Sequence, residues 1–221
     1  MCPHRREAAA GLRQFGPVAA KWWSGRGAAP QTVAMPQLIA PTLRVQASFL
    51  EAMKELRAEG RGEAGDDSAV GREIREFAAE WDDPVVFSRY TDWLRSMTRE
   101  EVVRPLGYVP CTNLWYVDGD TYLGRLGLRH ELNDFLLELG GHIGYDVRPT
   151  ARRRGHATAM LRAALPLAHA LGIRSALVTC DTTNTASRRV IETCGGIFED
   201  ERGGKLRYWV PTRAEHVSDR P

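Results

Sequence analysis

The sequence predicts a mixed α/β domain, because helical and strand-like patterns alternate along most of its 221 residues. Asp118 and Gly119 join two β-type runs, which is a strong hairpin signal. Apolar residues from position 157 to 171 recur at helical spacing, directly after a strand-like segment. Hydrophobic residues make up 43% of the chain and charged residues 26%, so a sizeable core can be buried. These features predict one ordered domain with a strand-turn-helix unit at its centre.

The first predicted elements are helices. Apolar residues from 43 to 56 fall at mostly helical spacing, and Thr42 is suited to cap this helix. Residues 60–71 are rich in glycine and acidic residues, which predicts a loop. A second helical pattern spans residues 85–97, and Pro84 is well placed at its start.

The later part of the chain changes to β-type patterns. Residues 112–117 and 121–128 form the predicted hairpin, and 129–139 is expected to be a connecting loop or a short helix. Residues 141–147 alternate as a strand should, until Pro149 stops them. The following helix should be kinked at Pro166 and end at Gly172. The remaining predictions are a strand at 175–180, a helix at 185–193, and a hairpin of strands at 197–202 and 205–210.

Both ends of the chain differ from the predicted domain. Residues 1–30 are rich in Arg, Ala and Gly, hold Glu7 as their only acid, and lack the apolar stretch of a secretory signal. A disordered tail, or translated upstream sequence with the start at Met35, is favoured over a transit peptide. We therefore predict a tail at residues 1–34, a domain at 35–212 and a C-terminal tail at 213–221.

Composition excludes several classes of function. The formal net charge of +2 gives no basis for a nucleic-acid binder that works by bulk electrostatics. No apolar run approaches the ~20 residues that cross a bilayer, which predicts no membrane span. The four cysteines show no C-x-x-C pair and no metal-ligand spacing, so we expect reduced thiols, a cytoplasmic location and no metal.

The most informative segment is GYDVRPTARRRGHAT, at residues 144–158. Here a strand ends and a turn with Arg152, Gly155 and Ala157 opens a long helix. Free backbone N–H groups and the helix dipole make such a helix start suitable for binding anions. The small Gly155 and Ala157 let a phosphate approach those groups, and the neighbouring arginines add positive charge. A solvated basic turn is the alternative; a P-loop and a Rossmann fingerprint are both absent.

This turn resembles the acetyl-CoA-binding motif R/Q-x-x-G-x-G/A of the GNAT superfamily of N-acetyltransferases. Asn184-Thr185-Ala186-Ser187 and Gly195-Gly196-Ile197-Phe198 follow in the family's order and resemble its N-x-x-[AS] helix and its "GF" turn. The likeness covers roughly residues 112–210. The strings LRHELN, GGHIGYDVRP and ASRRVIETCGG are similar to a bacterial subgroup of predicted acetyltransferases.

The resemblance implies a GNAT-like, mostly antiparallel central sheet flanked by helices, with a strand splay that holds acetyl-CoA. The pantetheine would pair with the backbone of the strand before the turn, and the pyrophosphate would lie on N–H groups of residues 153–158. Helix capping is the alternative role for Asn184 and Ser187. The implied cofactor-binding residues are Tyr145, Val147, Arg152, Arg153, Arg154, Gly155, His156, Ala157, Thr158, Asn184 and Ser187.

The catalytic residues stay open at this stage. Acetyl transfer to an amine needs a group that accepts the amine proton and a donor for the leaving thiolate. Many relatives place a tyrosine seven residues after the Asn, where this chain has Ile191. Tyr208 is an alternative donor, and His142 and His130 are candidate bases because of their ordinary pKa. Glu138 and Glu131 are weaker bases, a water relay is equally open, and a structural role is the alternative for each histidine.

The resemblance predicts direct acetyl transfer from acetyl-CoA to an amine, carried by a small molecule or a peptide. A non-catalytic module that binds or senses acyl-CoA is the main alternative, because the family tyrosine is missing. An RNA-associated protein is a third alternative, based on the basic tail and the arginine turn. A homodimer is compatible with the family but is not indicated by any residue.

Overall fold

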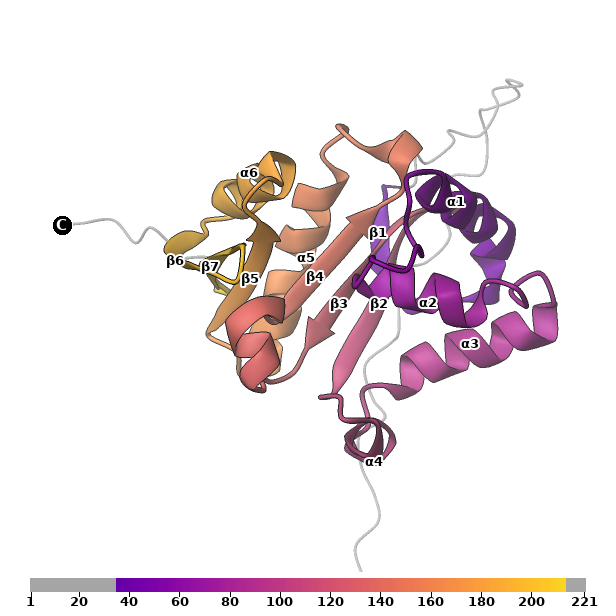
Figure 1. The fold of residues 1–221 in the computed structure, drawn as a ribbon, viewed down its shortest axis with the longest axis horizontal. Helices are drawn as coiled ribbons and strands as arrows, with labels where there is room; N and C mark the ends of the chain where they lie inside the picture. The colour runs from indigo at the N-terminus through magenta and orange to yellow at the C-terminus, as the bar shows by residue number, and fades with distance from the viewer. Residues whose placement is uncertain (1–34, 214–221) are drawn as a thin grey trace, which may run out of the picture. The chain divides into compact units, whose positions relative to one another are not determined.

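The computed structural model describes residues 35–213, which form a seven-stranded sheet flanked by helices (Figure 1). The strand order is β1-β2-β3-β4-β5-β7-β6. Every neighbouring pair is antiparallel except β4 and β5, which are parallel. The predicted α/β fold with a mostly antiparallel sheet is confirmed. The predicted tails at 1–34 and beyond residue 213 lie outside the described residues, so the domain boundaries stay a prediction.

The strands are β1 (Gln37–Ile39), β2 (Cys111–Asp118), β3 (Thr121–Arg129), β4 (Ile143–Val147), β5 (Ser175–Asp181), β6 (Ile197–Arg202) and β7 (Lys205–Pro211). The α-helices are α1 (Gln46–Ala58), α2 (Ala69–Phe77), α3 (Pro84–Ser96), α4 (Glu100–Val103), α5 (His156–Ala170) and α6 (Thr185–Thr193). Short turns of other helix types are η1 (Leu43–Val45), η2 (Arg104–Leu106), η3 (Leu136–Gly140) and η4 (Pro149–Ala151). Among residues 35–213, no helix combines the length and the apolar character that a membrane span requires.

Every element predicted between residues 43 and 210 is present. The predicted helix at 43–56 begins as η1, with the Thr42 side chain at its start, and continues as α1. The connecting segment at 129–139 contains the π-helical turn η3. The structure adds β1, α2, α4 and η2, which were not predicted from the sequence.

The predicted loop at residues 60–71 is wrong at its end, because α2 already begins at Ala69. Ser68 caps this helix by accepting the N–H of Gly71 at 3.0 Å. A Cβ on Gly71 would lie 2.0 Å from a carboxylate oxygen of Asp66, and that carboxylate accepts the N–H groups of Gly62 and Ser68. Gly71 therefore serves close packing inside a helix, whereas the sequence pattern favoured a loop glycine.

Two apolar cores cover the two faces of the sheet: in β2, Trp115 and Val117 belong to one core, and Tyr116, which alternates with them, belongs to the other. One core joins β3, β4, β5 and β7 to α5 and α6 through buried side chains such as Met160, Leu161 and Ile191. The other joins β2 and Tyr122 to α1, α2 and α3. In Figure 1, α1 to α3 accordingly gather at the β1–β3 end, and α6 lies at the β5–β7 end.

The second core is dominated by aromatic rings around Phe49 of α1. Phe49 is 1% exposed, and its ring centroid lies 5.0–5.9 Å from those of five other aromatic residues. These neighbours are Trp81, Phe87, Tyr90, Trp115 and Tyr122. Such contacts fix the position of α1 on the sheet.

We expect Phe49→Ala to lower the free energy of unfolding by about 3–5 kcal/mol, because it leaves a cavity among five rings. Phe135→Ala is the matched control: Phe135 is 61% exposed, and its loss should change stability by less than about 0.5 kcal/mol. Urea unfolding of both variants measures the difference. Equal midpoints would contradict the central place of Phe49 in this core.

Candidate functional site

Strands β4 and β5 meet at one end and then separate. His142 donates its N–H to the Leu177 carbonyl at 2.7 Å, and the Leu177 N–H donates to Nδ1 of the His142 ring at 2.9 Å. Ile143 and Val178 are the only register pair between the two strands within the described residues. Beyond this pair the ladder stops, so the carboxyl ends of two parallel strands are not bonded to each other.

The free edge of β4 faces this gap in the ladder. Backbone groups of successive residues in an antiparallel strand point to opposite sides. The His142 carbonyl accepts from Arg129 of β3, and the Arg148 N–H donates to Leu123 of β3. Gly144 and Asp146 are separated from these two residues by even numbers of positions, so their backbone groups also point toward β3. The backbone groups of Tyr145 and Val147, which alternate with them, point toward β5 instead. These are the two residues predicted to bind the pantetheine.

The turn between β4 and α5 exposes a run of backbone donors. Arg153 and Gly155 both adopt positive φ, at 65° and 82°, so the chain curls before the helix begins. The first helical bond at this end runs from Ala159 N–H to the Gly155 carbonyl. Within residues 35–213, the six N–H groups of residues 153–158 have no hydrogen-bond acceptor. Six adjacent donors at a helix N-terminus are an arrangement that suits an anion.

Helix α1 holds this turn in place through two glutamates. Glu55 accepts hydrogen bonds from Arg148 and from both the N–H and the hydroxyl of Thr150. Burial raises the pKa of Glu55, but these hydrogen bonds outweigh burial, and its pKa lies below the ordinary value. Glu59 accepts both Nη groups of Arg152, at 2.8 and 2.7 Å. The Arg152 guanidinium is thus engaged with α1, and its Nε donates to the Val147 carbonyl.

The other two arginines of the turn, Arg153 and Arg154, form no ion pair with the described residues. Arg153 and Arg154 are exposed, and neither has a carboxylate within ion-pair distance in the described part of the chain. Burial and the neighbouring Arg154 lower the pKa of His156, whose Nε2 is buried without a partner among the described residues. The local charge at the start of α5 is therefore positive.

Helix α6 begins beside the separated strands. The Asn184 side chain accepts the Ser187 N–H at 3.0 Å, so Asn184 is the N-cap of this helix. The Ser187 hydroxyl lies 2.8 Å from the Tyr145 hydroxyl, which connects β4 to α6 across the gap. Burial raises the pKa of Tyr145, and the phenol is therefore protonated at neutral pH.

The predicted bases occupy different environments. His142 is 7% exposed, and the Leu177 N–H already occupies its Nδ1. Burial and the charge of Arg129 lower the pKa of His142 to about 4, so its ring is neutral at pH 7 with the proton on Nε2. No free lone pair remains on that ring for a substrate proton. His142 is therefore well placed to hold the β4–β5 junction.

His130 and Tyr208 lie away from the start of α5. His130 follows β3, and its Nε2 is 2.8 Å from the Thr112 hydroxyl. Tyr208 belongs to β7 and is 2% exposed; its hydroxyl donates to Glu192 of α6 at 3.2 Å. The strand β5 separates Tyr208 from β4. The structure thus does not bring His142, His130 and Tyr208 together into one constellation.

A carboxylate that the sequence analysis did not single out lies on the α2 side of β4. Asp146 is half-buried, and its Oδ1 lies 3.6 Å from Arg61. Burial raises the pKa of Asp146, while the charges of Arg125 and Arg61 lower it in part. Arg125 is itself paired with the buried Glu73 of α2. Strand parity with His142 was visible in the sequence, but the burial of Asp146 was not.

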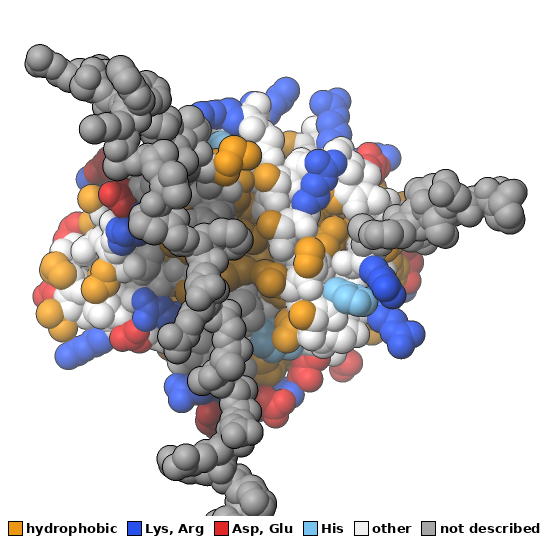
Figure 2. Space-filling model, turned by 180° about the vertical axis from the view of Figure 1, so that it is seen from behind, with side chains coloured by type: hydrophobic (Ala, Val, Ile, Leu, Met, Phe, Trp, Pro, Cys, Tyr) orange, Lys and Arg blue, Asp and Glu red, His pale blue; other side chains and the backbone are white. Residues whose placement is uncertain are grey.

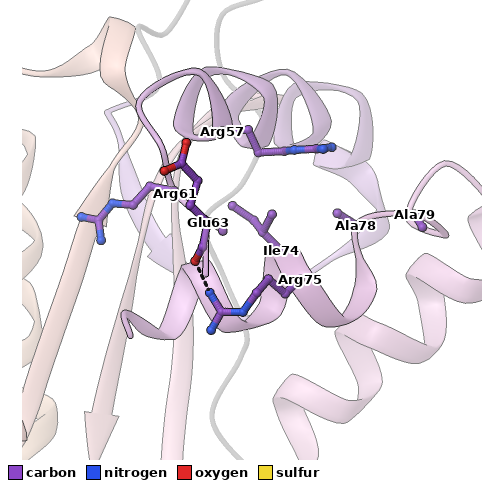
Figure 3. Close-up of a pocket in the computed structure, with 8 residues that line it drawn as sticks. Arg57, Arg61, Glu63, Ile74, Arg75, Ala78 and Ala79 are labelled. Carbon is purple, nitrogen blue, oxygen red and sulfur yellow. Dashed lines mark hydrogen bonds between the residues drawn. The ribbon is translucent and has the colours of Figure 1, made fainter. Parts of the chain in front are cut away.

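A hollow of ≈470 Å³ lies between the end of α1 and α2 (Figure 3). Arg57 extends across it toward Ala78, and Arg75 donates to the Glu63 carbonyl at 2.9 Å. Arg61 points away from the hollow, in the direction that brings it to Asp146. Arg57, Arg61 and Arg75 therefore make the lining of this hollow basic, and Arg61 connects it to the Asp146 carboxylate.

Two observations bear on the other predicted partners. Basic and acidic side chains are interspersed over the face drawn in Figure 2, which shows no extended basic surface among its described residues. Within residues 35–213, no group of three or more His, Cys, Asp or Glu side chains is arranged to hold a metal ion.

Comparisons with known proteins identify the family of this chain and its fold. The family described as acetyltransferase (GNAT) domain matches residues 71–197, which is more than half of the chain. A comparison with curated protein sequences finds no significant match.

Solved structures share the fold at low sequence identity. RimJ from Mycobacterium smegmatis, in complex with CoA-disulfide, is 17% identical with a TM-score of 0.55, covering 82% of this chain and 83% of that one. The ribosomal-protein-S5-alanine acetyltransferase from Vibrio fischeri is 10% identical with a TM-score of 0.54, covering 83% and 96%. The microcin C7 self immunity acetyltransferase MccE, in complex with acetyl-CoA and AMP, is 11% identical with a TM-score of 0.51, covering 79% and 91%.

The low pKa of His142 predicts a pH-dependent stability. Its pKa is about 4 in the folded chain and 6.5 ordinarily, so the unfolded chain binds the proton more tightly. The contribution of His142 to the free energy of unfolding is fully present above its ordinary pKa. This contribution decreases as the pH falls, by about 2 kcal/mol between about pH 7 and about pH 5.

In His142→Asn, an amide oxygen can accept the Leu177 N–H but does not titrate. The decrease in the free energy of unfolding that comes from His142 should therefore be absent from this variant. His169→Asn, at an exposed position on α5, should keep it. Urea unfolding at the two pH values decides. The same loss in His142→Asn as in the unaltered chain would refute the assignment.

Proposed function

This chain belongs to the GNAT family of acetyltransferases, and we propose that it transfers an acetyl group from acetyl-CoA directly to an amine. In this reaction the amine nitrogen bonds to the thioester carbonyl carbon and the C–S bond breaks. The amine loses one proton and the sulfur of CoA gains one, so the balance needs no further reactant. The protein must hold the thioester, accept the first proton and supply the second.

The observation that supports this proposal most strongly is the run of free N–H groups at residues 153–158. A diphosphate carries negative charge that backbone donors, the helix dipole and the exposed Arg153 and Arg154 can stabilise together. Arg152 contributes differently, because its bonds to Glu59 and Val147 hold the turn in shape. His156, Ala157 and Thr158 supply N–H groups from the first turn of α5.

The pantetheine arm would continue from this turn along the free edge of β4. The backbone groups of Tyr145 and Val147 point into the gap between β4 and β5, where an extended amide chain can add to the ladder. This path brings the thioester toward the junction at Ile143 and Val178, where the strands meet.

The proposed proton donor for the leaving sulfur is the hydroxyl of Tyr145. It belongs to the strand that borders the gap and is bonded to Ser187 of α6, close to the path of the arm. Tyr208 is one strand farther away and its hydroxyl is bonded to Glu192. Tyr145 would thus supply a phenol where the family position holds Ile191.

The proposed base is Asp146, which lies between Tyr145 and Val147 on β4 but faces the opposite side of the sheet. An amine that approaches the arm from the α2 side passes this carboxylate. Its pKa is raised by burial, which makes it a stronger base than an exposed aspartate. The charged groups around it are Arg61, Asp66, Glu73 and Arg125.

We expect Gly155→Glu to weaken acetyl-CoA binding by at least about 100-fold, because a carboxylate side chain would repel and displace the diphosphate. Gly172→Glu, at the other end of α5, is the matched control. Both glycines have positive φ, 82° and 84°, and open space where a Cβ would be, so the backbone strain is alike. Calorimetric titration with acetyl-CoA should show normal affinity for Gly172→Glu. Unaltered affinity for Gly155→Glu would rule out this binding site.

We expect Asp146→Asn to lower kcat by about 10²–10⁴-fold while acetyl-CoA affinity stays normal, because only the proton acceptor is removed. In the unaltered chain the rate should fall at acid pH as Asp146 becomes protonated, and that limb should be absent from the residual rate of the variant. Asp118→Asn, at the exposed end of β2, controls for the loss of one negative charge. A variant with full kcat would remove Asp146 from the mechanism.

A further inference from the structure

Arg129, at the end of β3, is a half-buried arginine that has no carboxylate partner within the described residues. In the described part of the chain, the other poorly exposed arginines each face a carboxylate: Arg125 faces Glu73, Arg148 faces Glu55, and Arg207 faces Glu199 and Asp200. For Arg129 no carboxylate lies within 4.0 Å among residues 35–213. A poorly solvated charge without a counterion is costly, so such a group is suited to receive one from a ligand.

The Arg129 guanidinium uses only one of its nitrogen atoms in hydrogen bonds to residues 35–213. Its Nη1 donates to the carbonyls of Gly140 and Gly141, both at 3.1 Å. Nε and Nη2 have no acceptor in residues 35–213. These two atoms form one side of the planar guanidinium, and two parallel N–H groups match the two oxygens of a carboxylate. The bonds to the η3 segment fix the orientation of that free side.

The charge around Arg129 is also positive. Burial lowers the pKa of Arg129, and repulsion from Arg72 and Arg125 lowers it further. Arg72 of α2 donates to the Asp67 carbonyl and forms no ion pair within the described residues. Since Glu73 neutralises Arg125, the charges of this group that have no counterion among residues 35–213 are those of Arg129 and Arg72.

Next to Arg129, two glycines lie opposite each other on β3 and β4. Gly127 of β3 and Gly144 of β4 are paired in register, share the face that carries Arg129 and Asp146, and are both half-buried. A Cβ on Gly144 would meet nothing closer than Nη1 of Arg129 at 3.7 Å, and one on Gly127 would lie 3.5 Å from the Cys111 sulfur. Neither glycine has a positive φ, so neither is required by the backbone. The Arg129 guanidinium therefore lies over Gly144, so a ligand bound to it would lie beside this pair of glycines.

The glycine pair lies between Arg129 and Asp146 along the two strands. The backbone N–H of Arg129 donates to the His142 carbonyl at one end of the pair, and Asp146 lies opposite Arg125 in the strand register at the other end. Each step of two residues along a strand covers about 6.6–6.8 Å. A small molecule with an anionic group at one end and an amine a few bonds away therefore spans the distance from Arg129 toward Asp146.

We propose that the acceptor carries a carboxylate that binds Arg129, with its body beside Gly127 and Gly144 and its amine toward Asp146. The acceptor class is then an amine that also carries a carboxylate, such as an amino acid. This inference rests on the proposed acetyl transfer, and it adds the class of acceptor.

Matched pairs of acceptors test the inference. Glycine, β-alanine and γ-aminobutyrate are each compared with their carboxamides, by acetyl-CoA consumption with the full chain. For the best of the three spacings, we expect kcat/KM of the acid to exceed that of the amide by about 100-fold. In Arg129→Gln this ratio should fall to near one, with little change for the amide. Arg89→Gln, at an exposed position on α3, should keep the full ratio.

The variants also separate a binding role from a structural one. If Arg129 only held the η3 segment, Arg129→Gln would affect acids and amides equally, and that result would overturn the proposal. Gly144→Ala adds one methyl group in unstrained backbone, and we expect it to raise the acceptor KM at normal acetyl-CoA affinity. Equal rates for acids and amides in the unaltered chain would also overturn it.

A binding measurement keeps the inference separate from the proposed function. N-acetylglycine and N-acetylglycinamide are titrated into the CoA-saturated protein, which needs no turnover. Binding of the acid alone, lost in Arg129→Gln, supports the carboxylate subsite even if no amine is acetylated, and the failure then lies with the proposed reaction. If amines are acetylated but neither titration distinguishes acid from amide, the reaction stands and the subsite is wrong.

Discussion

The early end of the β4–β5 ladder is the constraint on which the rest of the structure depends. A parallel pair normally continues its hydrogen bonds along both strands. Here the His142 ring takes the Leu177 N–H, one register pair follows, and the two carboxyl ends then carry no bonds to each other. As a result, the starts of α5 and α6 lie at the ends of separated strands, where backbone donors stay available.

The apolar cores and the polar contacts of α1 serve that arrangement. The rings around Phe49 fix α1 on the sheet, and Glu55 and Glu59 extend from the same helix to the turn before α5. The shape of the turn therefore depends on contacts with α1 as well as on the residues of the turn itself. An anion site built from backbone N–H groups needs such support, because the donors must stay aligned before the ligand arrives.

Much of the fold could be predicted from the sequence, because its signals are local. The Asp118-Gly119 turn, the helical spacing after residue 156 and the Gly203-Gly204 turn each specify an element from neighbouring residues. The turn before α5, which carries the free N–H groups of residues 153–158, was predictable for the same reason. Helix α2 was not, since the Gly71 that suggested a loop is needed for contact with Asp66.

The catalytic side of the site could not be predicted, because it depends on contacts between distant residues. His142 has a suitable ordinary pKa, but its role changes once the Leu177 N–H occupies the ring. The proposed roles of Asp146 and Arg129 rest on the burial of Asp146 and on the lack of a carboxylate partner for Arg129 among residues 35–213, which sequence spacing does not reveal. Tyr145 was predicted for its backbone, and its hydroxyl became relevant only through Ser187.

The most direct test of the central claim is an amide NMR titration of the ¹⁵N-labelled chain with acetyl-CoA. If acetyl-CoA binds at the start of α5 and along the edge of β4, the N–H resonances of residues 153–158 should shift most, together with those of Tyr145 and Val147. The resonances of β1 and β2 should stay unchanged. Saturable binding that leaves residues 153–158 unperturbed, or no binding at all, would contradict it.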